Sequence, residues 1–177
     1  MRIPDYAHPA VKELHTYWQS LAPEGKLPSR QHIDPVDIAP LLPNIWLLEV
    51  HREPLRFWRR LVGTRIEEYS GRNLTRGWIH DKVHDKVEEA KLLNVSKSLI
   101  DVVETKMPNW RRGKPNISEH ADYAELERLY LPLASDSETV DMILAITVFF
   151  KKPEPGNRDA GYFPAHQTQD CENTRDL

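Results

Sequence analysis

Apolar positions first repeat at helical spacing near the N-terminus. Four apolar residues recur every three or four positions, which puts them on one side of a helix over residues 8–21. They are Val11, Leu14, Trp18 and Leu21. A short amphipathic helix must bury such a stripe, either on its own domain or on a second copy of the chain. We favour the second copy, and predict a homodimer whose interface is formed by these four residues.

Apolar runs of strand length follow further along the chain. Residues 45–50 and 57–62 predict a hairpin around a turn that contains Pro54. Three more strands are expected over 110–118, 123–133 and 139–150. Between the hairpin and these strands, helices are predicted over 64–69 and 82–106, and another begins before the hairpin at the Asp34-Pro35 pair.

This order of elements predicts an α+β fold, with helices gathered on one face of a single antiparallel sheet. We divide the chain into an N-terminal helical segment (1–26), a domain (27–150) and a tail (151–177). The tail has only six apolar side chains among its 27 residues. That is too few to offset the entropy of ordering it, so we expect the tail to be flexible.

Net charge and cysteine content exclude several classes of function. The net charge is −3, which argues against a protein that binds polyanions through its overall charge. Cys171 is the single cysteine, so no internal disulfide and no cysteine-based metal cluster can form. The longest apolar run, 142–150, is too short to cross a bilayer, and the first residues lack the apolar stretch of a signal peptide. We expect a cytoplasmic protein that does not bind membranes.

Three stretches resemble the PAS domain family, in particular its stand-alone, uncharacterised alphaproteobacterial subfamily. They are LPSRQHIDPVDIAPLLPNIWLLEV (27–50), FWRRLVGTRIEEYSGRNLTRGWI (57–79) and LYLPLASDSETVDMILAI (129–146). The resemblance implies a five-stranded sheet whose concave face is closed by helices. It also implies a sensor or adaptor that binds a small ligand or a downstream protein partner. It specifies no cofactor, although Cys171 lies outside the domain and so excludes covalent thiol photochemistry.

In the PAS fold the ligand lies between the sheet and the helices, and the resemblance therefore implies a set of lining residues. We expect an aromatic or fatty acid there, because apolar walls with one buried cation suit such a ligand. Arg59 and Arg60 are adjacent in a strand, so one of them must face the helices; we choose Arg60 as the anchor. The alternative is that the rings fill the space and the domain is purely structural. The predicted lining residues are Trp58, Arg60, Tyr69, Trp78, Trp110 and Tyr130.

Other kinds of function remain as alternatives. Segment 52–78 holds seven arginines with Trp58 and Trp78, a composition that a nucleic-acid or anion-binding surface would also have. We consider a solvated sheet edge more common, and expect no nucleic-acid partner. His80 and His84 have the spacing of metal ligands on a helix, but no third ligand is evident, so we predict no metal site. No nucleotide-binding or hydrolase motif is present, and we expect no enzymatic activity.

Overall fold

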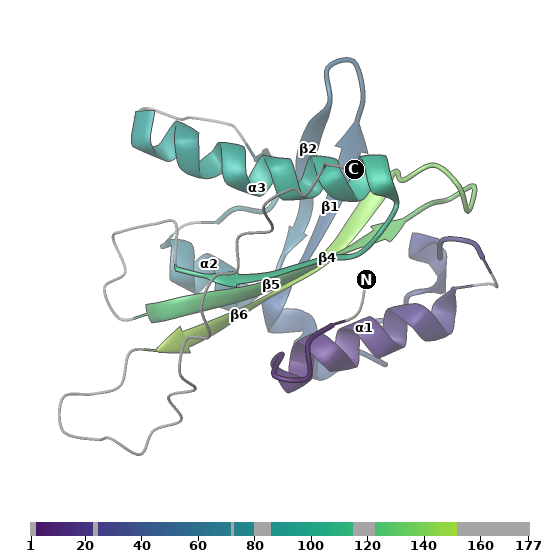
Figure 1. Cartoon of the computed structure of the whole chain (residues 1–177), viewed down its shortest axis with the longest axis horizontal. Helices are drawn as coiled ribbons and strands as arrows, with labels where there is room; N and C mark the ends of the chain where they lie inside the picture. Colours follow the sequence, from purple (N-terminus) through teal and green to yellow (C-terminus); the bar gives the residue numbers. More distant parts are fainter. Residues whose placement is uncertain (1–2, 23–24, 72, 80–85, 115–122, 152–177) are drawn as a thin grey trace, which may run out of the picture.

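The computed structural model describes residues 3–22, 25–71, 73–79, 86–114 and 123–151. Within these residues, one antiparallel sheet holds six strands in the order β3-β2-β1-β6-β5-β4 (Figure 1). The strands are β1 (Ile45–His51), β2 (Arg56–Val62), β3 (Gly77–Trp78), β4 (Asn109–Gly113), β5 (Tyr123–Leu133) and β6 (Met142–Lys151). The α-helices are α1 (Pro9–Leu21), α2 (Thr64–Ser70) and α3 (Lys86–Thr105), and short 3₁₀ helices are η1 (Arg30–His32) and η2 (Ala39–Asn44).

The predicted α+β class is confirmed, but the sheet has six strands among the described residues and not five. The additional strand, β3, consists of two residues that pair with Trp58 and Arg59 of β2. Two residues are too few to show an alternating pattern, so this strand cannot be predicted from periodicity. The strand expected over 110–118 ends at Gly113, and residues 115–122 lie outside the described part of the chain.

The two faces of the sheet are covered by different helices (Figure 1). We call the face under α3 the inner face and the face under α1 the outer face. Side chains alternate between them along each strand. In β5, Leu129 and Leu131 join the outer cluster with α1, while Tyr130 between them joins the inner cluster with Leu99 and Val102 of α3. The fold therefore has three layers, and not one helical layer on one face as the sequence suggested.

Helix α1 buries its apolar stripe on the chain's own sheet. Val11 and Leu14 are fully buried in the outer cluster, and Trp18 and Leu21 pack against it while remaining partly exposed. The indole Nε1 of Trp18 donates to the carbonyl oxygen of Pro132 at 2.9 Å. Val11 and Leu14 therefore have no surface left to contact a second copy, so the structure does not support the interface that we predicted through them.

The segment that opens at Asp34 differs from the predicted helix. The Asp34 carboxylate accepts from the backbone N–H of Val36 at 2.8 Å, which makes a local turn and not an α-helical cap. The chain then forms the 3₁₀ helix η2, which contains Pro43. Pro43 cannot donate the backbone hydrogen bond that an α-helix would need at this point.

The backbone of η2 passes very close to Gly63, the residue that lies between β2 and α2. A Cβ atom at Gly63 would lie 2.3 Å from the carbonyl oxygen of Pro43 and 2.4 Å from that of Leu42. Only glycine allows this approach. Helix α2 then ends at Gly71, whose left-handed conformation (φ 66°) terminates the helix.

A buried carboxylate ties the N-terminus to the outer face. Glu127 of β5 is completely buried, and both of its oxygens accept from the backbone N–H of His8, at 3.0 and 3.2 Å. Its Oε1 also accepts from the indole Nε1 of Trp110 at 2.8 Å. We call these three residues the Glu127 clasp. It fixes the start of α1 to strands β4 and β5.

Candidate functional site

Arginine side chains from three strands lie on the inner face. The cross-strand register pairs Arg111 of β4 with Arg128 of β5, and Arg128 with Thr147 of β6. Arg59 of β2 pairs with Leu48, a residue of the inner cluster. Cations are costly to bury unless an anion compensates them, so this face is chemically unusual.

Arg128 is the central cation of this group. Burial lowers the pKa of its guanidinium, and the positive charge of Arg111 acts in the same direction, whereas Tyr130 and Tyr69 oppose it. Part of the Arg128 surface still remains accessible. Within the described residues, Arg128 makes no ion pair and no hydrogen bond. A deep, partly accessible cation that has no carboxylate partner among the described residues is suited to hold an anion.

The other two arginines are held by hydrogen bonds. Arg111 donates from Nη1 to the Ser98 hydroxyl of α3 at 2.6 Å. Arg59 donates from Nη2 to the carbonyl oxygen of Trp78 at 2.6 Å, and its guanidinium lies against Gly77, where a Cβ would come within 3.0 Å of Nη2. Both side chains are therefore positioned before any ligand arrives.

Aromatic and hydroxyl groups surround Arg128. The ring of Tyr69 from α2 contacts that of Phe149 from β6, with 4.6 Å between centroids. Tyr130 is buried in the inner cluster. The Trp46 indole Nε1 donates to the Thr147 hydroxyl at 2.9 Å, across β1 and β6. The inner face thus combines flat apolar surfaces with cations, which suits an organic anion.

The structure does not bring the six predicted ligand-binding residues together. Tyr69 and Tyr130 lie on the inner face, as expected. The other four lie on the outer face: Trp58, Arg60, Trp78 and Trp110. Arg60 is exposed and forms an ion pair with Glu49.

A bulge explains why Arg59 and not Arg60 faces inward. The β1–β2 register shifts between Leu47 and Leu48, so Leu47 pairs with Leu61 while Leu48 pairs with Arg59. Arg60 is the extra residue and remains on the outer side. Sequence alone gives no sign of this shift. Arg128, in contrast, could have been found, because the alternation of Leu129, Leu131 and Leu133 places Arg128 on the opposite face.

The outer-face tryptophans of segment 52–78 form a compact group. Trp58 and Trp78 meet edge to face at 5.0 Å, and the edge of His51 meets Trp78 at 4.9 Å. The guanidinium of Arg56 lies 3.9 Å from the centroid of the Trp78 ring. These contacts already occupy the ring of Trp78 on which a nucleic-acid base would stack. The geometry therefore gives this alternative no added support.

A family profile described as PAS domain matches residues 6–148, which is most of the chain. The chain belongs to the PAS domain family. The matched region begins before α1, the helix that the sequence analysis places in a separate N-terminal segment. No curated protein matches the chain in sequence. Membership in this family indicates a sensory or signalling module.

Two further sequence predictions bear on the site. His80 and His84 lie outside the described residues. Within the part of the PAS domain that the structure describes, no three His, Cys, Asp or Glu side chains gather as metal ligands would. In the same part of the chain, no helix has both the length and the apolar character needed to cross a membrane.

Proposed function

We propose that this PAS domain is a non-catalytic sensor that binds a small organic anion on the inner face of its sheet, with Arg128 as the anchor. One observation carries the proposal: Arg128 is deep in the domain, partly accessible, and has no ion pair within the described residues. Holding a cation in that environment costs free energy, and a bound carboxylate would offset this cost.

The surroundings of Arg128 favour a carboxylate with an apolar body. Tyr69, Phe149 and Tyr130 provide ring surfaces near the cation. Arg111 supplies a second positive charge close to the first. An aromatic or fatty acid would place its carboxylate between the two guanidinium groups and its apolar part against the rings.

A thermal-shift screen of benzoate, phenylacetate, hexanoate and octanoate tests this proposal. A ligand present at about 100 times its dissociation constant stabilises the folded state by about 2.7 kcal/mol. We expect at least one of these acids to stabilise the domain, and Arg128→Met to abolish the gain, because methionine keeps much of the side-chain volume but cannot bind the carboxylate.

Arg60→Met is the matched control, since it removes a guanidinium from the outer face. It should leave the response to the acids unchanged. If Arg128→Met keeps the full response, or if none of the four acids stabilises the wild-type domain, the anchor and ligand class proposed here are wrong.

We also propose that the domain signals as a homodimer to a downstream protein partner. The support is the common use of PAS domains in dimerisation. Of the exposed residues of α1, all but Pro9 are polar (Lys12, Glu13, Thr16, Gln19 and Ser20), and the partly exposed apolar side chains that α1 offers to a second copy are Ala10, Tyr17, Trp18 and Leu21. Light scattering should give twice the 20.6 kDa chain mass, and a monomer would contradict the proposal.

A further inference from the structure

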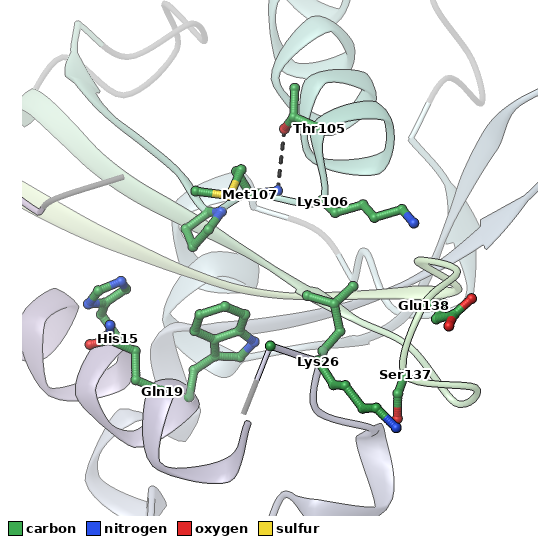
Figure 2. Close-up of a pocket in the computed structure, with 12 residues that line it drawn as sticks. His15, Gln19, Lys26, Thr105, Lys106, Met107, Ser137 and Glu138 are labelled. Atoms are coloured by element: carbon green, nitrogen blue, oxygen red, sulfur yellow. Dashed lines mark hydrogen bonds between the residues drawn. The ribbon is translucent and has the colours of Figure 1, made fainter. Parts of the chain in front are cut away.

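A pocket lies at one end of the sheet, where the layers on its two faces come together. It has a volume of about 400 Å³, within the range of small-molecule sites. Its lining comes from α1, from residues 25–27, from the end of α3 and the segment after it, and from the β5–β6 turn (Figure 2). We call it the edge pocket. None of the inner-face arginines lines it.

Part of the edge-pocket wall is flat and apolar, formed by Trp18 and Met107. The Trp18 ring is fixed by its hydrogen bond to Pro132, and it stacks on the His15 ring with centroids 6.2 Å apart. Burial lowers the pKa of His15, so its imidazole is neutral near pH 7. Met107 also lines the pocket and is 48% exposed, so part of its apolar surface is open to an occupant. Such walls suit an aromatic ring.

The charged lining of the edge pocket is mainly positive. Lys26 and Lys106 line it, against one carboxylate from Glu138. Figure 2 shows both lysines on the side of the pocket near Ser137 and Glu138, opposite His15 and Gln19. Neither lysine side chain forms an ion pair within the described residues.

The backbone holds Lys106 in place. Its φ of 59° is in the left-handed region, and the backbone N–H of Met107 donates to the Thr105 hydroxyl at 3.3 Å. Lys26 precedes Leu27, whose N–H donates to the carbonyl oxygen of Ser137 at 3.1 Å. Both cations therefore project from segments with fixed backbone.

We propose that the edge pocket is a second ligand site, specific for a small aromatic anion whose ring packs on Trp18 and Met107 and whose charge meets Lys26 and Lys106. This proposal is independent of the inner-face site. Because the lining is shared between α1 and the segment after α3, an occupant would contact both and would favour the docked position of α1.

Isothermal titration calorimetry tests the edge pocket. The two ligands are naphthoate and its uncharged counterpart, naphthamide. We expect naphthoate to bind the wild-type domain more tightly than naphthamide. The double variant Lys26→Gln/Lys106→Asn should weaken naphthoate binding about tenfold or more, because two charged contacts are lost, and should leave naphthamide binding unchanged. Asparagine tolerates the left-handed backbone at position 106, so the fold should persist.

Two single variants serve as controls. Lys97→Gln removes one positive charge from an exposed position of α3 that does not line the pocket, and should leave naphthoate binding unchanged. Because an aromatic acid also suits the inner face, the titrations are repeated in the Arg128→Met background, where naphthoate binding should persist and should still depend on Lys26 and Lys106. Loss of all binding in Arg128→Met would assign naphthoate to the inner face and overturn the proposal, as would undiminished binding when the two lysine substitutions are added to Arg128→Met, or no binding at millimolar concentration.

Hydrogen exchange tests the link to α1. Naphthoate should slow exchange of the α1 amides several-fold in the wild-type domain and not in the double variant. If naphthoate binds as expected but exchange in α1 does not change, occupancy of the pocket does not stabilise the docked helix, and that part of the proposal is wrong.

Discussion

At the level of single residues, Gly63 is a point where two backbone segments approach each other closely. An alanine Cβ there would overlap the carbonyl oxygens of Pro43 and Leu42, which belong to backbone and cannot rotate away. We expect Gly63→Ala to lower the free energy of unfolding by about 2–3 kcal/mol, the usual cost of overpacking. Urea denaturation measures it.

Gly113→Ala is the control for this substitution. Gly113 has no atom within 4 Å of an added Cβ, so its replacement should change stability by less than about 0.5 kcal/mol. Equal stability of the two variants would show that η2 and the β2–α2 junction can separate without cost.

The arginines show what sequence can predict about single residues. Side chains alternate along a strand, so either Arg59 or Arg60 must face the helices. Which of the two does so depends on the bulge opposite Leu47 and Leu48, and a bulge is set by the pairing of two strands that each look regular alone. Arg128 was predictable from its own strand, because its neighbours Leu129 and Leu131 fix the outer face.

At the level of secondary-structure elements, the Glu127 clasp links α1, β4 and β5. Glu127→Ala would leave two part-buried donors, the His8 N–H and the Trp110 indole N–H, without their acceptor. We expect a loss of about 2–4 kcal/mol in the free energy of unfolding. Glu127→Gln retains one acceptor oxygen and should lose less than half as much. Denaturant titration of both variants compares them, and an unchanged stability of Glu127→Ala would show that the N-terminal segment contributes nothing.

Local patterns predicted most elements to within a few residues, because helical and strand periodicities depend only on neighbouring side chains. The stripe of α1 and the strands β1, β2, β5 and β6 are examples. The pattern failed where geometry is set by distant contacts or by proline. Strand β3 exists only as a partner of β2, and the helix expected to begin at the Asp34-Pro35 pair is a turn followed by the 3₁₀ helix η2.

The hydrophobic pattern of a helix does not predict which face of the sheet the helix covers. The stripe of α1 shows that one side is buried, but not against which surface. Two of the six predicted ligand-binding residues lie on the inner face, because the tryptophans were chosen for their chemistry before their faces were known. At the level of the whole molecule, the face of the sheet on which a side chain lies determines whether it can contribute to the inner-face site.

The extent of the domain can be tested by truncation. Strand β6 ends at Lys151, and the family match ends at residue 148. Deleting residues 152–177 should lower the melting temperature by no more than a few degrees, corresponding to about 1 kcal/mol. A chain that also lacks Phe149, Phe150 and Lys151 is the comparison, since it loses the pairs that these residues make with β5. Loss of soluble expression on the shorter deletion would show that residues 152–177 pack on the domain.

The sheet order has a consequence for how the molecule folds. β1 and β6 are neighbours in the middle of the sheet although their paired residues are about a hundred positions apart in the chain. Joining them closes a long loop before any of the central hydrogen bonds can form, and such high contact order slows folding. During synthesis, β1 and β5 each have an unpaired edge until β6 leaves the ribosome. The nascent chain is therefore vulnerable to aggregation until β6 has emerged.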